Sequence, residues 1–581
     1  MGLFLLSDCG KNTRMFDDCF SSTGESFRLF MQNKLFLHLT LMVVVISELF
    51  GAVAPSQARP VSVMQLIPLV PHPKMLVASG EMTPFPAYLS VHGLDPLNPA
   101  HAGAIDTLEE LFHVLPGVKA DFGGTAPYCV QFEQSDQIAH PEGYTLTADA
   151  SGIKVLYCTE AGQFYGAQTV YQLLAYAFHG TEFVSFGDTL VEKDAATERY
   201  VPTLSIADEP AYRVRSFMAD LGRTPYSMPL LKRLIRIMGQ LKLNTLHLHL
   251  WDDQLCGFRF AKLPMGHENP FSLTADDLRE IVRYARIHHI SVMPEMESWG
   301  HVASIVYHYP ELCAGEGMFR GASFGIGEKS YELLEKMYDE VVPCLEDTAA
   351  VHVGMDESRW GLLPGEESKG HTPETMLGRI YDILMRVAAK HHKQITMHLW
   401  ADHAGRPLPK ELEDKVVIEP WRYLERDGPS IVQDLERYGG AGKTPMMMGA
   451  GARSTAYDGS YEATRIWCQE GLKYPNVLGV TLCLWESNDL AGRLITLYGG
   501  ADYAWTPETP VRRDNDPFGE DLREHMGREM RSWQIIFPEA NPGAIDLDRG
   551  LEVKTGRYVW PPFAGKAVAP TVDFVVPGNE N

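Results

Sequence analysis

Short apolar runs that suit β-strands alternate with amphipathic helical segments between residues 215 and 485. The strand-like runs occupy 215–221, 245–251, 290–294, 350–354, 395–400, 416–420, 446–450 and 477–485. Apolar residues recur at helical spacing in 228–241, 275–288, 329–345, 374–391 and 461–474. Eight strands, most of them followed by a helix, over about 290 residues predict a closed parallel barrel, the (β/α)8 or TIM barrel.

The segment before the barrel has a different pattern. Residues 144–148 and 153–158 alternate apolar and polar side chains around a Ser151–Gly152 turn, which predicts a β-hairpin. Residues 160–174 carry apolar side chains at helical spacing. The predicted fold class is therefore α/β, a TIM barrel preceded by a small α+β domain. We assign 59–205 to the small domain, 206–512 to the barrel, and 513–581 to a C-terminal helix (522–536) and extended tail.

The first 58 residues have the features of a signal-peptide region. The apolar run 35–46 is shorter than the roughly 20 residues that a membrane-spanning helix needs. Ser56 and Ala58 supply small side chains at the −3 and −1 positions of a cleavage site before Arg59. We predict translation from Met31 and a secreted or periplasmic protein; an uncleaved membrane anchor is the alternative.

Charge and cysteine usage exclude several classes of partner and site. Lys and Arg number 51 against 75 Asp and Glu, a formal net charge of −24 at pH 7. This charge argues against a nucleic-acid partner and against anionic membranes, and it favours a neutral small molecule or glycan as the partner. Once the signal region is removed, we expect no stable membrane insertion. The cysteines after the leader are widely spaced and form no Cys-x-x-Cys pair, which predicts small buried side chains rather than disulfides or a zinc site.

Carboxylates and indoles gather at the carboxyl ends of the predicted strands, the end at which barrel active sites are built. They are Asp220, Asp252, Asp253, Glu295, Glu297, Asp356, Glu357, Trp400, Asp402, Trp421, Tyr457, Asp458, Trp485 and Glu486. Indoles suit the apolar faces of a sugar ring, and the carboxylates together with Arg215 suit its hydroxyls. The pattern predicts a sugar-sized pocket.

Asp356 and Glu357 are adjacent carboxylates at the end of the fourth predicted strand. Neighbouring side chains in a strand point to opposite faces, so both can reach one ligand only where the strand has ended. Gly354 would permit such a turn. Two close carboxyls in a partly dry pocket do not both ionise easily, so we expect one to stay protonated and to serve as a general acid.

Three segments carry a resemblance to a known family. Residues 243–254 contain His-Leu-His-Leu-Trp-Asp-Asp-Gln, residues 292–301 contain Pro-Glu and Gly-His, and residues 352–357 read His-Val-Gly-Met-Asp-Glu. Together they resemble the motifs of glycoside hydrolase family 20, the β-N-acetylhexosaminidases, and residues 143–174 are similar to the small domain that precedes the barrel in that family. The resemblance implies an exo-acting enzyme that hydrolyses terminal non-reducing β-linked GlcNAc or GalNAc from glycans, without a cofactor or metal, by a retaining mechanism.

The resemblance also implies a role for each matched residue. Glu357 would protonate the leaving oxygen and then activate water, and Asp356 would orient the substrate's 2-acetamido group, whose oxygen is the nucleophile. The implied substrate-binding residues are Arg215 on the 3- and 4-hydroxyls, Asp253, His301 as support, Trp400, Trp421 and Trp485 as walls, Tyr457 on the acetamido oxygen, Asp458, and Glu486.

Two segments depart from the family pattern. Glu486 lies one place nearer Trp485 than the family's Leu-Trp-x-Glu would put it. Glu297 is followed by Ser-Trp where the family more often has Met-Pro, so we expect a different pocket rim.

Two other readings compete with the glycosidase. A metal-dependent barrel hydrolase could use His247 and His249 as a ligand pair, but it needs further ligands, and His352 and His398 lie within strands rather than at their ends. The second alternative is a barrel that binds glycans without hydrolysing them. Such a protein would be expected to lack the catalytic acid, whereas this sequence retains Glu357.

Overall fold

The structure is a computed structural model. It describes residues 69–115, 117–179, 183–186, 189–192, 199–224, 226–316, 322–358, 361–366, 369–402, 408–440, 442, 444–451, 461–485, 490–509, 558–559 and 571–572. The predicted signal-peptide region 1–58 and the predicted helix 522–536 lie outside these residues. Within the described ranges, no helix combines the length and the apolar character needed to cross a bilayer.

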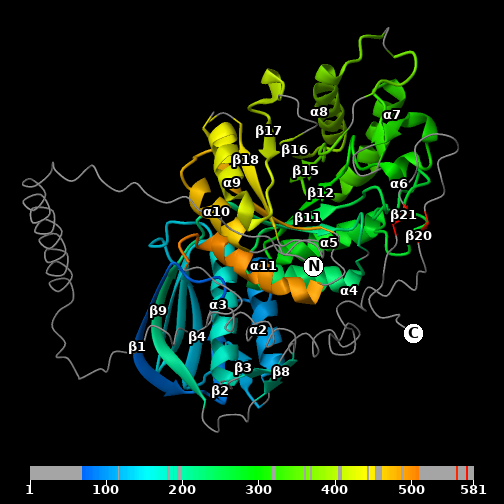
Figure 1. Cartoon of the computed structure of the whole chain (residues 1–581). Helices are drawn as coiled ribbons and strands as arrows, with labels where there is room; N and C mark the ends of the chain where they lie inside the picture. The colour runs from blue at the N-terminus through cyan, green and yellow to red at the C-terminus, as the bar shows by residue number, and fades with distance from the viewer. Residues whose placement is uncertain are drawn as a thin grey trace, which may run out of the picture. The chain divides into compact units, whose positions relative to one another are not determined.

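The small domain is a seven-stranded mixed sheet with two long helices packed together beside it (Figure 1). The strands, in sheet order, are β1 (Met75–Pro84), β9 (Tyr200–Asp208), β5 (Tyr144–Asp149), β6 (Gly152–Tyr157), β4 (Tyr128–Gln134), β2 (Tyr88–His92) and β3 (Lys119–Phe122). The helices are α2 (Ala102–Val114) and α3 (Glu160–His179), and α3 packs on β5, β6 and β9. The predicted hairpin and helix are both confirmed.

Strand β9 corrects the predicted domain boundary. It pairs with β1 and β5 as far as Asp208, so it crosses the boundary that we placed between residues 205 and 206. The small domain therefore ends after Asp208, and the barrel begins with β10 (Val214–Asp220).

Eight parallel strands close into a barrel, as predicted. After β10 they are β11 (Thr245–His249), β12 (Ser291–Glu295), β15 (Thr348–His352), β16 (Gln394–Trp400), β17 (Val416–Glu419), β18 (Met446–Gly451) and β19 (Val477–Leu484). Each predicted strand overlaps an observed one, and β19 pairs with β10 to close the ring.

Three of the helices around the barrel, α4, α5 and α8, begin at residues whose side chains cap them. Ser227 accepts a hydrogen bond from the Leu230 N–H at the start of α4, and Thr274 forms a capping box with Asp277 at the start of α5.

The main helices that surround the barrel are α4 (Met228–Gln240), α5 (Ala275–Ile287), α7 (Glu328–Val341), α8 (Pro373–Lys390), α10 (Tyr461–Gly471) and α11 (Leu490–Trp505). Shorter elements are α6 (Ala303–Val306), α9 (Gly428–Asp434), and the strand pairs β7 (Phe183–Phe186) with β8 (Thr189–Glu192), β13 (Cys313–Glu316) with β14 (Ala322–Phe324), and β20 (Tyr558–Val559) with β21 (Thr571–Val572).

Cysteines form no cross-links within the described residues. All seven cysteines described there are free, and Cys256, Cys344, Cys468 and Cys483 are buried, whereas Cys129, Cys158 and Cys313 are partly buried. The prediction of small buried side chains is confirmed for the four buried cysteines and is wrong for the three that are only partly buried.

A buried ion pair joins the small domain to the barrel. The Lys242 ammonium, between α4 and β11, donates to Asp208 Oδ2 at 2.8 Å and to the Tyr144 hydroxyl at 2.8 Å. The Trp505 indole donates to the other oxygen of Asp208 at 2.8 Å. The side chains of Lys242 and Asp208 are only 2% and 0% exposed. Because both charges are out of water, each depends on the other.

We predict that Asp208→Asn destabilises the protein by about 3–5 kcal/mol, because it removes the carboxylate that contacts the buried Lys242 ammonium. The shift of the urea unfolding midpoint measures this. The neighbouring variant Glu209→Gln is the control. It breaks the exposed pair with Lys74 and should change stability by less than about 1 kcal/mol. Equal midpoints for the two variants would contradict the prediction.

Candidate active site

The chain turns sharply after β15 and presents two carboxyls at the same point. Gly354, Met355 and Glu357 have φ angles of 66°, 85° and 47°, all in the left-handed region. A Cβ at Gly354 would lie 1.9 Å from a carboxylate oxygen of Glu297, so only glycine fits there. Asp356 and Glu357 each approach His301 Nε2 to 3.5 Å. The prediction that both adjacent carboxyls reach one point is confirmed.

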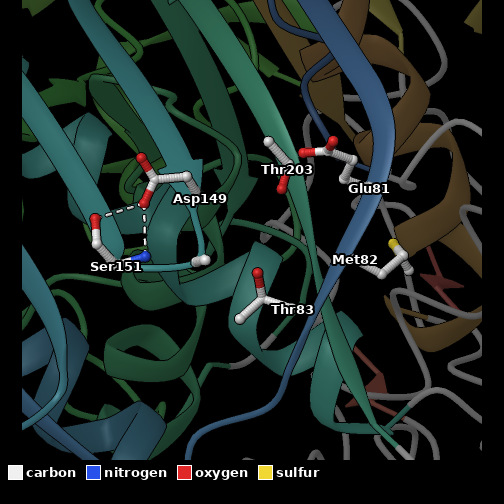
Figure 2. Close-up of a pocket in the computed structure, with 7 residues that line it drawn as sticks. Glu81, Met82, Thr83, Asp149, Ser151 and Thr203 are labelled. Carbon is white, nitrogen blue, oxygen red and sulfur yellow. Dashed lines mark hydrogen bonds between the residues drawn. The ribbon is translucent and has the colours of Figure 1, made fainter. Parts of the chain in front are cut away.

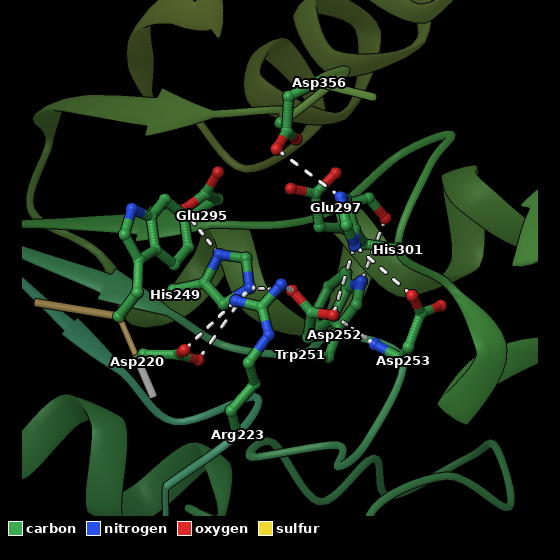
Figure 3. Close-up of polar contacts among 12 residues, drawn as sticks. Asp220, Arg223, His249, Trp251, Asp252, Asp253, Glu295, Glu297, His301 and Asp356 are labelled. Atoms are coloured by element: carbon green, nitrogen blue, oxygen red, sulfur yellow. Dashed lines mark hydrogen bonds and ion pairs between the residues drawn. The ribbon is translucent and has the colours of Figure 1, made fainter. Parts of the chain in front are cut away.

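His301 lies between Asp252 and Asp253 on one side and Asp356 on the other (Figure 3). Its Nδ1 is 3.4 Å from Asp252 and 3.3 Å from Asp253, on the side away from Asp356 and Glu357. Burial opposes the charged ring, but these carboxylates raise the pKa of His301 well above its ordinary value. His301 is therefore an imidazolium cation that holds the acids together.

Burial and like charge change the protonation of the carboxyls at the turn. Burial, reinforced by the charges of Asp402 and Glu295, raises the pKa of Asp356 to about 6. Burial next to Asp356 raises the pKa of Glu297 well above its ordinary value. Glu297, which accepts the Met355 N–H at 3.3 Å, is thus a protonated partner for Asp356. The sequence led us to expect that either Asp356 or Glu357 stays protonated as the general acid. The structure adds Glu297 as a third, protonated carboxyl beside them.

Glu295 is the centre of a charged cluster below the mouth. It accepts hydrogen bonds from the Trp400 indole at 2.6 Å and from His249 Nδ1 at 2.6 Å, and His249 Nε2 lies 2.8 Å from Asp252. Burial opposes the imidazolium, but Glu295 and Asp252 raise the pKa of His249 to about 10. Arg223 extends the chain of charges, because its guanidinium is 2.6 Å from Asp252 (Figure 3).

The three predicted tryptophans meet on one side of the mouth. Trp400 and Trp485 have ring centroids 5.8 Å apart, and Trp421 stacks on Tyr423 at 5.4 Å. The Trp485 indole donates to the Tyr423 hydroxyl at 3.0 Å. Met218 and Cys483 complete this apolar cluster. The structure therefore brings these indoles beside the acids, as the sugar-pocket hypothesis requires.

Arg215 is the clearest error of the sequence reasoning. It lies near the amino end of β10, fully buried, and its guanidinium donates to both oxygens of Glu142 in the small domain at 2.9 and 2.8 Å. It also donates to the carbonyls of Lys242 and Tyr212. Arg215 therefore ties the two domains together at the end of the barrel opposite the mouth and does not grip sugar hydroxyls.

Asp253 reaches the site but is buried. One of its oxygens accepts the N–H groups of Ala303 and Ala322 at 2.9 and 3.0 Å, and the other faces His301. Asp253 supports His301 and the loop after β12, contrary to its prediction as a sugar ligand. Tyr457, Asp458 and Glu486 lie outside the described residues, so their predicted roles stay predictions.

The two side chains after Glu297 are buried. The Ser298 hydroxyl bonds to the Tyr338 hydroxyl at 2.5 Å, and Trp299 is fully buried against Phe324 and Tyr331. The expectation that the pocket rim differs from the family's stays a prediction.

Sequence reasoning missed Arg223, Tyr423 and the role of Asp402. Arg223 lies three residues after β10, with its guanidinium 5.2 Å from the Trp485 ring centroid. Asp402 lies two residues after β16 and bonds to the Glu357 N–H at 3.2 Å. Each follows the carboxyl end of a strand, and this position is the signal that could have identified them.

Three groups of side chains in the described part of the chain have ligand atoms close enough for a metal. They are His247 with Glu295 and His352, His249 with Glu295 and Glu297, and Asp252 with Asp253 and His301. Both ring nitrogens of His249 are already hydrogen-bonded, to Glu295 and to Asp252. His352 Nδ1, the atom that faces Glu295, accepts the Gly354 N–H at 3.1 Å. The chelation experiment described below tests the metal-dependent alternative.

A separate open pocket lies on the small-domain sheet (Figure 2). Its volume is about 720 Å³, and its lining includes Glu81, Thr83, Asp149 and Thr203. Asp149 is held in a turn by the Ser151 N–H and hydroxyl. None of the carboxylates of the barrel mouth lines this pocket, so it is not the candidate active site.

Comparisons with known proteins agree with this architecture. A β-hexosaminidase of Porphyromonas gingivalis is 31% identical over 243 residues, covering 38% of this chain and 30% of the relative. A lacto-N-biosidase of Bifidobacterium bifidum is 26% identical over 317 residues, covering 50% of this chain and 25% of the relative. The chain thus spans less than a third of either relative's length.

Solved structures share the fold. The chitobiase of Flavobacterium johnsoniae superposes with a TM-score of 0.61 at 19% identity, over 82% of this chain and 74% of that one. The N-acetyl-β-hexosaminidase of Streptomyces plicatus gives a TM-score of 0.57 at 20% identity, over 83% and 97% of the two chains.

Fold and site together define a glycoside hydrolase barrel with an accessory α+β domain. The family models of the glycosyl hydrolase family 20 catalytic domain and of its domain 2 match residues 212–436 and 66–209. The chain belongs to glycosyl hydrolase family 20.

Proposed function

We propose that this protein is an exo-acting β-N-acetylhexosaminidase that removes terminal, non-reducing β-linked GlcNAc or GalNAc from glycans. The observation that carries the proposal is the turn after β15, which directs Asp356 and Glu357 to one cation beside a wall of indoles. Family membership and the similarity to a β-hexosaminidase support it.

In the proposed reaction, Glu357 protonates the glycosidic oxygen as its bond to the anomeric carbon breaks. The oxygen of the substrate's own acetamido group attacks that carbon and forms a cyclic oxazolinium ion. Asp356 accepts the acetamido N–H and stabilises the positive charge that develops. Water then attacks the anomeric carbon while Glu357 takes a proton from it. The bond between that carbon and the acetamido oxygen breaks, which restores the acetamido group and gives the sugar with retained β configuration.

We further propose that residues 1–58 direct export and are then removed, so that the mature enzyme is secreted or periplasmic and has no stable membrane insertion. The apolar run 35–46 and the small residues before Arg59 support this. Sequencing of the mature amino terminus tests it, because a chain that retains the run 35–46 would contradict cleavage.

Glu357→Gln should keep the fold and lower turnover of substrates with poor leaving groups by roughly 10²-fold or more, the usual scale of general acid catalysis. The glutamine amide cannot donate the proton that the leaving oxygen needs. Steady-state kinetics on an alkyl β-N-acetylglucosaminide measure the loss. Unimpaired turnover would remove Glu357 from the mechanism.

Sensitivity to a chelator distinguishes the proposed metal-independent glycosidase from a metal-dependent hydrolase. EDTA should leave wild-type turnover unchanged in the same assay. Loss of activity on chelation that zinc restores would instead support ligation by His247 and its neighbours.

Asp356 should control the acid side of the pH profile. Its pKa is raised to about 6, so the carboxylate is the main form only above that pH. If Asp356 must accept the acetamido N–H as an anion, kcat/KM should fall by about tenfold per pH unit below pH 6. The residual activity of Asp356→Asn should lack this ionisation. A wild-type profile that stays level well below pH 6 would contradict the assignment.

The acetamido group should be required. β-N-Acetylglucosaminides should be cleaved while matched β-glucosides are nearly inert, and a thiazoline that mimics the cyclic intermediate should inhibit strongly. Proton NMR of the first-formed sugar should show the β-anomer. An initial α-anomer, or comparable cleavage of the β-glucoside, would overturn the mechanism.

A further inference from the structure

Asp402 uses its two carboxylate oxygens to hold two different parts of the mouth. Oδ2 accepts the backbone N–H of Glu357 at 3.2 Å, and Oδ1 accepts the indole N–H of Trp421 at 3.2 Å. Asp402 follows β16, Glu357 follows β15 and Trp421 follows β17, so one side chain links the ends of three adjacent strands.

The Glu357 end of this link lies on strained backbone. Glu357 has a φ angle of 47°, which L-residues adopt only at a cost. Met355, also at positive φ, donates its N–H to the Glu297 carboxyl. Two carboxyls from strands on either side, Glu297 after β12 and Asp402 after β16, therefore hold the turn in the shape that directs the Glu357 side chain.

The Trp421 end connects to the whole aromatic wall. Trp421 stacks on Tyr423 with an interplanar angle of 17°, the Tyr423 hydroxyl accepts the Trp485 indole N–H, and Trp485 packs against Trp400. A displacement of the Trp421 ring would therefore also displace the Tyr423, Trp485 and Trp400 rings. The Asp402 carboxylate thus sets the position of the general acid relative to the surface on which a sugar would lie.

The link requires a carboxylate rather than any polar side chain. A carboxylate offers two acceptor oxygens, whereas a carboxamide offers one acceptor and one N–H donor. An asparagine at 402 would therefore turn a donor towards either the Glu357 N–H or the Trp421 N–H. Burial raises the pKa of Asp402, while the hydrogen bonds from Glu357 and Trp421 oppose this and favour the ionised form.

We propose that Asp402 is a positioning residue of the hydrolysis, which holds the Glu357 backbone and the Trp421 indole in register through the two oxygens of one carboxylate. This role rests on the proposed glycosidase function. It does not require Asp402 to touch the substrate.

The test compares Asp402→Asn, Trp421→Phe and the double variant on two β-N-acetylglucosaminides, one with a good aryl leaving group and one with a poor alkyl leaving group. A misplaced general acid matters most when the leaving group needs the proton. Asp402→Asn should therefore lower kcat by about tenfold or more on the alkyl substrate and clearly less on the aryl substrate. Trp421→Phe keeps the ring stack and should raise KM more than it lowers kcat.

The double variant gives the sharpest outcome. Once the Trp421→Phe change has removed the indole donor, the asparagine carbonyl at position 402 can accept the Glu357 N–H, and its amide group faces only a ring. The double variant should then have a kcat within about threefold of Trp421→Phe alone, so that the two changes are not additive. Additive losses, or equal losses of Asp402→Asn on both substrates, would overturn the proposal.

Two controls keep the result interpretable. Asp347→Asn alters a 96% exposed carboxylate just before β15, at the opposite end of that strand, and should change neither substrate's kinetics. Thermal unfolding of each variant separates lost positioning from lost fold. If Asp402→Asn alone does not fold, the kcat of the double variant relative to that of Trp421→Phe decides whether Asp402 acts as a positioning residue. An inactive wild-type enzyme would overturn the proposed function itself, whereas an active enzyme indifferent to Asp402→Asn overturns only the positioning role.

Discussion

The charge of Glu295, buried beneath the barrel mouth, is the constraint on which the site depends. A carboxylate without water needs a cation close by, and His249 supplies it at 2.6 Å. The imidazolium of His249 in turn faces Asp252, and Asp252 lies between His249, Arg223 and His301. Charges of alternating sign thus run from the barrel core to His301, each stabilised by its neighbours. The last cation in the series faces Asp356 and Glu357.

This series explains why the acids at the mouth differ in protonation. His301 is close to four carboxylates, and its charge offsets part of the repulsion among them. Glu297 keeps a proton because burial and the charge of Asp356 raise its pKa by more than the charge of His301 lowers it. The loss of one member would leave a buried charge without its partner, so the cluster should respond to substitution as a unit.

The fold was predictable because its signals are local. Each strand is an apolar run bounded by turns, and each helix has its own periodicity, so sequence patterns located all eight strands of the barrel. The same patterns placed Asp356, Glu357 and the indoles at one end. The error at Arg215 could have been avoided from strand geometry alone. Five residues of extended chain separate Arg215 from Asp220 by about 17 Å, so the two side chains cannot both lie at the mouth of the barrel. The sequence placed Asp402 at the mouth, but its role and that of Tyr423 were missed because both roles arise from contacts between strands, which no local pattern records.

The arrangement of the two acids also limits the chemistry available at this mouth. Both Asp356 and Glu357 approach the same nitrogen of His301, each to 3.5 Å. A retaining enzyme with a protein nucleophile needs its two carboxyls on opposite sides of the anomeric centre, about 5–5.5 Å apart. Asp356 and Glu357 are instead sequence neighbours in one tight turn and face one imidazole nitrogen. Under the proposed function, Glu357 protonates the leaving group and Asp356 receives an N–H, so the nucleophile would come from the substrate. The turn that Gly354 permits would then favour acetamido sugars over plain glycosides.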